Sequence, residues 1–269
     1  MRSIFTGAVF IFSSACALFG QTPVVAEGGV LNGASFVKGQ AVAPGSLVSI
    51  FGTNLASANA LANSIPISTT LANSVTVTFN GVAAPLLGVF HDPVNGDQIN
   101  AQLPWEVSNG TANVVVNNSN GSSAPVGVNI GPSPGIFASG TQAIAYGNSD
   151  GIIAAANGSI PGLTTHPAKI NDPATLVILA TGLGPVNPPV QTGNIVTDNQ
   201  VHNTTTTPTV TVGNVPAQVV FSGMTPQFVG VYQINIIIAP GTPTGDAIPL
   251  QITMSGITTP SNITIAVSN

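Results

Sequence analysis

PGSLVSIFGTNL at residues 44–55 and PATLVILATGL at residues 173–183 are the two stretches of sequence that decide the fold. Each holds a short, mostly apolar run with Pro before it and Gly after it. Such a run is typical of a β-strand that is buried on both faces. The two stretches therefore predict equivalent buried strands, with Leu47 and Leu176 at matching positions.

Three further pairs of segments repeat in the same order along the chain. They are VTVTFNGVAA at 75–84 with PTVTVGNVPA at 208–217, QINAQL at 98–103 with QINIII at 233–238, and GTANVVV at 110–116 with GDAIPL at 245–250. A single matching tripeptide could arise by chance, but four blocks in one order could hardly do so. We therefore predict that residues 40–130 and 170–267 superpose as two copies of one unit, with the QIN tripeptides on equivalent strands.

The repeated blocks have the pattern of short strands joined by tight turns. Residues 75–79 and 209–212 alternate with period two, which gives each strand one buried and one solvated face. Asn-Gly at 80–81 and Gly-Asn at 213–214 signal hairpins with positive φ. Each copy of ~100 residues holds about six or seven such strands, the pattern of an immunoglobulin-type sandwich. The predicted fold class is all-β, with two tandem immunoglobulin-like sandwiches; a single larger barrel is the alternative that the repeat disfavours.

The repeat divides the chain into four predicted segments. Between the copies lie an apolar run and a hairpin signal, with arms at 143–146 and 152–155, so we expect this part to pack against one or both sandwiches. The second copy also contains a polar stretch without periodicity at 192–208, which predicts a mobile surface loop. The segments are a signal peptide at 1–20, immunoglobulin-like sandwich 1 at 28–130, a connecting segment with a hairpin at 131–169, and immunoglobulin-like sandwich 2 at 170–269.

The N-terminus has the pattern of a secretory signal peptide. A positively charged start at residues 1–2 precedes the apolar run 4–11. Small residues place the cleavage after Ala17 or between Gly20 and Gln21. The sequence therefore predicts a secreted protein that is extracellular or at the cell surface, with the periplasm as the alternative location.

The only cysteine, Cys16, lies inside this leader. It could anchor a lipid instead, although Ser13 stands three residues before it where a lipoprotein signal has Leu. No later segment reaches the ~20 apolar residues of a membrane span, so none is expected after signal removal. The mature chain would contain no disulfide, and packing alone would stabilise it.

Charge is scarce along the whole chain. Only 4% of the 269 residues are charged, against roughly a quarter in an ordinary soluble domain, and the net charge is −5. After signal removal the cations are Lys38 and Lys169. Two lysines cannot neutralise a phosphate backbone, which excludes nucleic-acid binding, and they give no attraction to anionic lipid.

Metal ligands are few and widely spaced. His91, His166 and His202 are the three histidines, and none lies at helical spacing from another, so we interpret them as loop residues. Oxygen ligands at Asp92 to Asp97 could hold Ca²⁺, but the stretch lacks the Asp-x-Asp-x-Asp-Gly order and the distal Glu. A polar β-turn is the preferred interpretation, and no metal and no cofactor are expected.

The sequence carries no pattern of a catalytic centre. It has no Gly-x-Ser-x-Gly elbow, and the mature chain would have no thiol nucleophile. A glycosidase needs two carboxylates across a cleft, whereas the eight acidic residues are scattered in turns and Glu106 has no evident partner. We therefore expect a protein that is not an enzyme.

Trp105, the only tryptophan, is the first candidate contact residue. Pro240 takes its place in the second copy, so the fold itself does not require a tryptophan there. It could stack on a sugar or contact a protein partner. The preferred interpretation is a partly buried side chain that seals a strand end or the seam between the copies.

The QIN tripeptides supply the other candidates, Gln98, Asn100, Gln233 and Asn235. Side chains alternate along a strand, so the amides share one face and the apolar residues line the core. The amide pairs could form two equivalent ligand sites, or they could satisfy the backbone of a neighbouring loop, which is the preferred interpretation. The apolar set is Ile99, Ala101 and Leu103 in the first copy and Tyr232, Ile234, Ile236 and Ile238 in the second, and Gln102 falls with the first amide pair.

The pattern resembles a known class of domains. Gly45-x-x-Val48-x-Ile50-x-Gly52-x-Asn54-Leu55 and the strands after it are similar to IPT/TIG immunoglobulin-like domains. The full run from Asn32 to Val267 resembles an uncharacterised domain found at the C-termini of exported Acidobacteria proteins, known from Solibacter. The resemblance implies fold and export, and it implies no activity, substrate or catalytic residue. In that family the domain usually ends a longer protein, whereas here it makes up nearly the whole mature chain. The shared pieces include Asn32-x-Ala34-Ser35-Phe36, Pro104-Trp-Glu106, Pro134-Gly-Ile-Phe137, Ala180-Thr-Gly-Leu-Gly-Pro185 and Val229-Gly-Val-Tyr-Gln-Ile-Asn235.

Three functional hypotheses follow from the sequence. The first is a secreted or surface-associated, non-enzymatic module for adhesion or for matrix or envelope assembly, with an unknown extracellular protein or polysaccharide as partner. The second is a carbohydrate-binding module, which exposed aromatic residues lined up on one sheet face would indicate, although aromatics make up only 5% of the chain. The third is an extracellular hydrolase, which paired carboxylates in a cleft would indicate.

Overall fold

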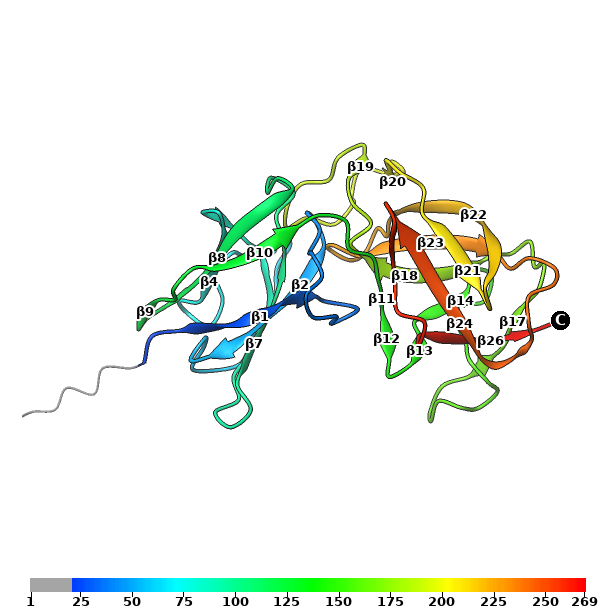
Figure 1. Cartoon of the computed structure of the whole chain (residues 1–269), viewed down its shortest axis with the longest axis horizontal. Coiled ribbons are helices and arrows are strands. Elements are labelled where there is room, and N and C mark those ends of the chain that lie inside the picture. The colour runs from blue at the N-terminus through cyan, green and yellow to red at the C-terminus, as the bar shows by residue number, and fades with distance from the viewer. Residues whose placement is uncertain (1–20) are drawn as a thin grey trace, which may run out of the picture.

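The computed structural model describes residues 21–269, so the predicted signal peptide and Cys16 lie outside the described residues. These residues form strands, turns and loops, and the chain is all-β, with two tandem immunoglobulin-like β-sandwiches. The sandwiches lie one after the other along the long axis, with β1 and the C-terminus at opposite ends (Figure 1). Within residues 21–269, no helix has the length and apolar character needed to cross a membrane.

The first sandwich consists of two antiparallel sheets. One sheet has the strand order β1-β2-β7-β6-β3, and the other has the order β10-β8-β4-β5 with β9 at the end of β8. Their facing side chains form one buried cluster that includes Ile50, Ile99, Phe79 and Val116. The strands are β1 (Val24–Asn32), β2 (Leu47–Thr53), β3 (Ala60–Leu61), β4 (Thr76–Phe79), β5 (Val82–Ala83), β6 (Leu86–Phe90), β7 (Asp97–Gln102), β8 (Gly110–Asn118), β9 (Gly121–Ser122) and β10 (Val126–Ile130).

The second sandwich repeats this arrangement around its own core, which includes Ile178, Ile234 and Ile252. Its two layers are joined into one strand network, because the first residues of β22 pair with β21 and its later residues pair with β23. In the first sandwich the equivalent strand is divided into β5 and β6, and Pro85, which has no N–H to donate, lies between them. The strands are β18 (Leu176–Thr181), β19 (Val186–Asn187), β20 (Asn203–Thr204), β21 (Thr209–Val212), β22 (Val215–Met224), β23 (Tyr232–Ile237), β24 (Gly245–Met254), β25 (Ile257–Thr258) and β26 (Thr264–Ser268).

The predicted connecting segment is part of the second sheet network. β11 and β14 pair with β18, and β13 and β17 pair with β26. The predicted hairpin is present, with Tyr146 of β14 opposite Ile153 of β15. The predicted domain boundaries remain predictions, but this segment packs on the second sandwich, as expected, and adds strands to its sheet network. Its strands are β11 (Gly135–Ile136), β12 (Ala138–Ser139), β13 (Gln142–Ala143), β14 (Ala145–Gly147), β15 (Ile153–Ala154), β16 (Thr165–His166) and β17 (Ala168–Lys169).

The two copies share even their irregularities. The QIN tripeptides lie on β7 and β23, each the strand that pairs with the apolar strand of its copy. Facing this strand, a bulge interrupts the pairing between Leu86 and Gly88 in the first copy and between Val219 and Phe221 in the second. A bulge conserved in position between two copies indicates one inherited sheet geometry.

One predicted correspondence is wrong by one residue. Ser49 lies opposite Asn100, and Val177 lies opposite Asn235, so the partner of Leu176 in the first copy is Val48 and not Leu47. A shift of one residue moves a side chain to the other face of the sheet. Leu47 is accordingly only half-buried, whereas Leu176 is buried. The apolar run could not reveal this, because neighbouring positions in it are equally hydrophobic.

Candidate functional site

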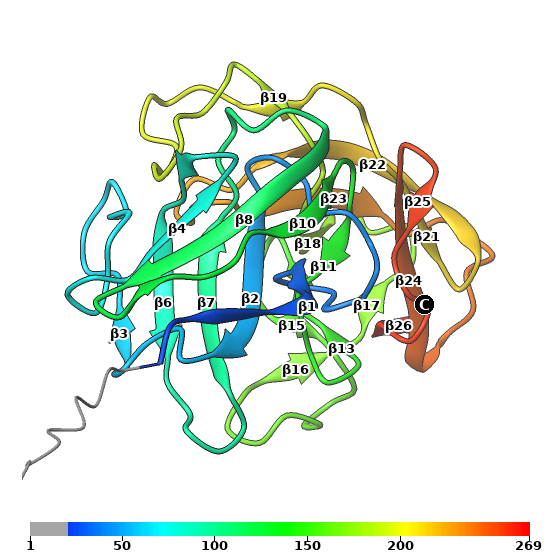
Figure 2. The same cartoon turned by 60° about the vertical axis from the view of Figure 1, so that its left-hand side comes forward.

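The QIN strands orient their side chains as predicted. Ile99 and Ile234 are fully buried in the two cores, as are the other apolar residues on their faces. Gln98 and Asn100 are half-buried on the opposite, outer face of the sheet β1-β2-β7-β6-β3, whose central strands lie side by side in Figure 2. This outer face is the candidate site.

Two rows of cross-strand neighbours define this surface. In one row Phe51 of β2 and Phe90 of β6 flank Gln98 of β7. In the next row Ser49 and Gly88 flank Asn100. Directly opposed residues in a sheet project to the same side, so aromatic rings and amides stand together. We call this surface the amide–aromatic face; it consists of Phe36, Ser49, Phe51, Gly88, Phe90, Gln98 and Asn100.

Two of the three aromatic residues of this face are open to solvent. Phe36 is 46% exposed and Phe90 is 38% exposed. The Phe36 ring lies 6.4 Å from the Phe51 ring, centroid to centroid. A Cβ atom on Gly88 would come within 2.9 Å of the Phe90 ring, so glycine allows this ring to lie close against the sheet. Phe36 and Phe90 line a groove of about 230 Å³, together with Ser49 and Asn100 of the strands and Phe137 of the connecting segment.

The amides bond mainly to each other. Gln98 donates from Nε2 to Asn100 Oδ1 at 2.7 Å, and the Ser49 hydroxyl donates to the same oxygen at 2.9 Å. The preferred interpretation, that these amides satisfy the backbone of a neighbouring loop, is wrong for this pair. Within residues 21–269, Gln98 Oε1 and Asn100 Nδ2 bond to no other protein group. One acceptor and one donor therefore remain available at the surface.

Gln102, the third amide on this strand, has the structural role instead. It is fully buried, donates to the Gly45 carbonyl at 3.1 Å and accepts from the Gly193 N–H at 2.7 Å. Two backbone groups from different sandwiches thus depend on one amide. This contact could not be found from the sequence, because Gly193 is far along the chain in a stretch without periodicity.

The second copy keeps the amide pair but changes its surroundings. Gln233 donates to Asn235 at 3.1 Å, as in the first copy. Leu179 and Gly223 now flank Gln233, where the first copy has two phenylalanines. Only Phe221, opposite Asn235, provides a ring in these two rows. The two amide pairs are therefore not equivalent surfaces.

Trp105 lies in the seam between the sandwiches. It is half-buried, packs against the second core, and meets the Tyr232 ring edge-on at 6.5 Å. A Cβ atom on Gly45 would lie 2.3 Å from the indole, so the ring rests directly on the glycine backbone. Trp105 therefore packs in the seam and is not part of the amide–aromatic face.

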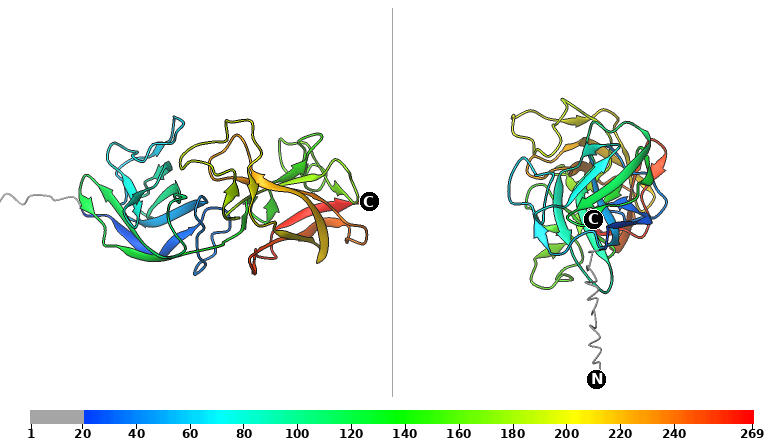
Figure 3. Two further views of the ribbon diagram at one scale, coloured as in Figure 1. Left: turned by 90° about the horizontal axis from the view of Figure 1, so that it is seen from above. Right: turned by 90° about the vertical axis from the view of Figure 1, so that its left-hand side faces the viewer.

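The segment 192–208, predicted as a mobile surface loop, is anchored to both sandwiches. The Thr192 hydroxyl accepts from the backbone N–H of Trp105 at 3.0 Å and donates to the Glu106 carboxylate at 2.7 Å. Gly193 is buried. Farther along, β20 pairs with β19 and with β22. Figure 3 shows this part of the chain arching over the seam.

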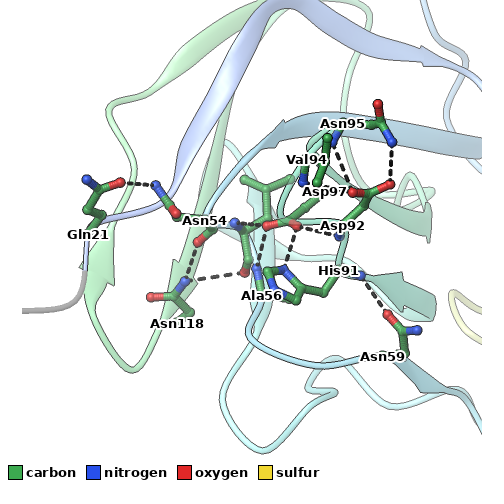
Figure 4. Close-up of polar contacts among 11 residues, drawn as sticks. Gln21, Asn54, Ala56, Asn59, His91, Asp92, Val94, Asn95, Asp97 and Asn118 are labelled. Atoms are coloured by element: carbon green, nitrogen blue, oxygen red, sulfur yellow. Dashed lines mark hydrogen bonds and ion pairs between the residues drawn. The ribbon is translucent and has the colours of Figure 1, made fainter.

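Asp97 holds a corner of the first sandwich, as Figure 4 shows. Its buried carboxylate accepts from Leu55 N at 2.7 Å, from Ala56 N at 3.2 Å, from Asp92 N at 3.1 Å and from His91 Nδ1 at 2.8 Å. The Asp92 carboxylate accepts from the N–H groups of Val94 and Asn95 and from the Asn95 side chain. N–H donors face both carboxylates. This arrangement is typical of a hydrogen-bonded turn, and it occupies the oxygens that a cation would need as ligands.

The other two histidines each bridge an aspartate and a proline carbonyl. His166 lies 2.9 Å from Asp150 and 3.0 Å from Pro167 O, and His202 lies 2.9 Å from Asp198 and 2.6 Å from Pro188 O. Both ring nitrogens then face acceptors, so the doubly protonated imidazolium fits best. Within residues 21–269 no three His, Asp or Glu side chains group as metal ligands.

The pKa values follow this geometry. The Pro167 carbonyl and then Asp150 raise the pKa of His166, and the Ile152 N–H and then His166 lower the pKa of Asp150. Burial alone would lower the pKa of His202, but its hydrogen bonds to Asp198 and Pro188 outweigh burial and raise it. The His166 pair lies at the rim of a cavity of about 570 Å³, also lined by Lys169 and Asp172. Charges of both signs there define no single class of ligand.

Sequence reasoning missed the aromatic part of the site. Phe51 and Phe90 lie on different strands, and only the register of β7 brings them to either side of Gln98. Phe36 belongs to the Asn-x-Ala-Ser-Phe stretch, where its own φ of 53° is rare for an aromatic residue. The one indication in the sequence was that Phe51 and Ser49 are two residues apart, so that both project from the same face of their strand.

Comparisons with known proteins show only distant similarity. No protein-family model and no curated protein sequence matches the chain. Among solved structures, it is similar to the SGBP-B protein of a Bacteroides ovatus mixed-linkage glucan utilization locus, in complex with a mixed-linkage heptasaccharide (12% identity, 85% of this chain and 43% of that one, TM-score 0.33). It is also similar to the extracellular region of plexin A4 (11%, 98% and 20%, TM-score 0.28) and to domains 5–6 of the S-layer protein SbsC (13%, 92% and 99%, TM-score 0.27).

The chain spans less than half the length of the first two of these structures. Identities and TM-scores this low carry no argument about activity, so the functional argument depends on the chain's own residues.

Proposed function

We propose that this protein is a secreted or cell-surface, non-enzymatic binding module that contacts an extracellular partner through its amide–aromatic face. The observation that carries the proposal is the combination of exposed Phe36 and Phe90 with two amides of β7 whose Gln98 Oε1 and Asn100 Nδ2 atoms bond to no other group within residues 21–269. Binding groups held on strands are positioned more accurately than groups on loops. Export is supported by the leader pattern, and the resemblance to exported Acidobacteria proteins is part of the same proposal.

The composition supports a binding role over a catalytic one. The eight acidic residues are spread through the whole sequence, and Asp92, Asp97, Asp150 and Asp198 accept hydrogen bonds from neighbouring N–H groups or histidines. A hydrolase would need two carboxylates free to act on one bond. The amide–aromatic face instead offers shape, ring surface and uncharged hydrogen-bonding groups.

The seam supports a role in which the two sandwiches act as one body. Leu47 N donates to the Thr181 hydroxyl at 3.0 Å, and this hydroxyl donates to Gly230 O at 2.7 Å. The Asn32 side chain donates to Ser133 O at 2.6 Å. Buried hydrogen bonds of this kind fix the orientation of one sandwich on the other. The binding face is therefore presented at a defined angle.

Retention on native cell-envelope material tests the proposal. The purified mature protein is immobilised and exposed to envelope fractions from the native host, and Phe90→Ala is compared with Phe221→Ala, which removes the ring beside the amide pair of the second copy. We expect Phe90→Ala to lose retention and Phe221→Ala to keep it. Equal retention by both variants, with both shown to be folded by circular dichroism, would reject the amide–aromatic face as the contact surface.

A further inference from the structure

The ligand chemistry of the amide–aromatic face can be read from its groove. We infer that it binds an uncharged polysaccharide, with sugar rings stacked on Phe36 and Phe90 and hydroxyl groups bonded to Gln98 and Asn100. This inference rests on the proposed function and names its ligand class.

Charge limits the class of ligand first. The groove is lined by apolar side chains together with Ser49 and Asn100, and by no charged residue. An ionic ligand would lose its hydration without gaining a counter-charge. The chain's net charge of −5 also repels an acidic polymer at long range. A neutral ligand is the one that this surface can accept without an electrostatic cost.

The free amide atoms match hydroxyl groups. Asn100 Nδ2 can donate and Gln98 Oε1 can accept, while the bond between the two side chains and the bond from Ser49 hold them in place. A sugar hydroxyl donates and accepts at once, so neighbouring hydroxyls can bond to both amides. Amides already fixed in position lose little entropy on binding.

The rings supply the apolar half of the recognition. Phe51, whose ring lies 6.4 Å from the Phe36 ring, and Phe90 lie on strands two positions apart, which separates the backbones of Phe51 and Phe90 by roughly 10 Å. This is about the length of a disaccharide. A pyranose presents C–H groups on one face and hydroxyls around its edge, so it can cover a ring and reach the amides between the rings.

Phe36 provides independent support. It is an exposed aromatic residue with a φ of 53°, a conformation that bulky residues rarely adopt. The lead-in loop holds this ring at the rim of the groove through Asn32, whose carboxamide oxygen accepts from Ala34 N at 2.8 Å and from Ser35 N at 3.0 Å. Backbone strain at an exposed ring is a feature found at binding sites.

The second copy provides a matched control within the molecule. Asn235 has a glutamine partner as Asn100 does, but Leu179 and Gly223 replace the two phenylalanines that flank the glutamine, and Phe221 opposite Asn235 is the one ring in these two rows. If the amide pair alone bound sugars, both copies would bind. If rings and amides are needed together, only the first copy binds.

The test is a binding titration of the full mature chain with neutral hexasaccharides of β-glucan, xylan and mannan types. Wild type, Phe90→Ala, Asn100→Ala and Asn235→Ala are compared, and urea midpoints verify that each variant is folded. We expect at least one hexasaccharide to bind, affinity to fall by roughly tenfold or more in Phe90→Ala and Asn100→Ala, and Asn235→Ala to match wild type.

Three results would overturn the inference. They are absence of binding to every neutral hexasaccharide, equal affinity of Asn100→Ala and wild type, or tighter binding of an acidic oligosaccharide such as oligogalacturonate. If neutral sugars fail while Phe90→Ala still abolishes retention on envelope material, the proposed function stands and the polysaccharide inference fails. If envelope retention is also insensitive to Phe90→Ala, both fail.

Discussion

Gln102 shows how one side chain can join two sandwiches. Its side-chain amide donates to the carbonyl of Gly45, the residue in contact with Trp105, and accepts from the Gly193 N–H of the second sandwich. The side chain is fully buried, so a leucine there would leave two backbone groups without partners or water. We expect Gln102→Leu to lower the free energy of unfolding by roughly 1–3 kcal/mol, measured by urea denaturation.

Asn100→Ala is the matched comparison. Asn100 bonds only to neighbouring side chains and is half-buried, so its loss exposes no buried backbone group. The buried Ser49 hydroxyl loses one acceptor, so we expect a loss of about 1 kcal/mol, smaller than that in Gln102→Leu. A larger loss in Asn100→Ala than in Gln102→Leu would show that the roles of the two amides have been assigned the wrong way round.

Stability should depend on pH through His166 and His202. Both pKa values are raised in the folded state, so the stabilisation is complete below the unfolded value of ~6.5 and is lost as pH rises through the raised values. The partner aspartates have lowered pKa values, so their contribution is present above about pH 4 and is lost as pH falls further. We expect the melting temperature to fall between pH 6 and pH 8.

Removing the charge of both partners provides the control for this prediction. In the double variant Asp150→Asn, Asp198→Asn the imidazolium forms lose their carboxylates, so the drop in melting temperature between pH 6 and pH 8 should shrink. An unchanged drop would assign the pH dependence to other groups.

At the scale of the element, hydrogen bonds connect the start of the QIN strand to the end of the apolar strand in both copies. The side chain that makes these hydrogen bonds differs between the copies. In the first copy Asp97 accepts hydrogen bonds from Leu55 N and Ala56 N. At the equivalent position Tyr232 donates its hydroxyl to Gly184 O. The Tyr232 hydroxyl is buried, which raises its pKa far above the usual value and keeps it a donor. The same strand ends are thus joined by a carboxylate in one copy and a phenol in the other.

The hydrogen bonds of Asp97 and Tyr232 should contribute different amounts to the free energy of unfolding. Asp97→Ala leaves two buried N–H groups without an acceptor and removes a charge-assisted contact, so we expect a loss of roughly 3 kcal/mol. Tyr232→Phe removes one neutral hydrogen bond and keeps the ring against Trp105, so we expect about 1 kcal/mol. Chemical denaturation of both variants measures the difference. Similar losses in the free energy of unfolding would indicate that these hydrogen bonds do not determine how much each contact stabilises its sandwich.

At the scale of the whole molecule, the seam should make the two sandwiches unfold together. Trp105 reports on this seam, because it is the only tryptophan and it packs against the second core. We expect tryptophan fluorescence and far-ultraviolet circular dichroism to give coincident urea transitions, the signature of a two-state process.

Weakening the seam should separate the two signals. Thr181→Val removes the hydroxyl that links Leu47 N to Gly230 O and leaves that carbonyl and N–H unpaired. In this variant we expect the fluorescence change to precede the loss of strand signal. Non-coincident transitions already in the wild type would contradict a single cooperative body.

Export is the remaining prediction at this scale. The leader pattern places cleavage after Ala17 or before Gln21, and intact-mass measurement of protein from the native host distinguishes these sites. A lipid on Cys16 would identify a lipoprotein instead. A chain that still begins with Met1 would contradict export by cleavage.

The sequence by itself determined the fold class, the repeat and the inward faces of the central strands. These depend on local information: alternation places Ile99 and Ile234 in the cores whatever surrounds them, and Asn-Gly turns favour hairpins by their own backbone preferences. The sequence also singled out Gln98 and Asn100, since a repeated polar pair inside an apolar strand is visible without a structure.

Only the tertiary structure decided what those residues do. The register of β2 and β6 against β7 brings Phe51 and Phe90 to either side of Gln98, and a slip of one residue would turn them into the core. The packing of residues 192–193 on the first sandwich brings the Gly193 N–H to the Gln102 side chain and the Thr192 hydroxyl to the backbone N–H of Trp105. Both outcomes depend on contacts between distant segments, and no local pattern encodes which distant backbone group will face a given side chain.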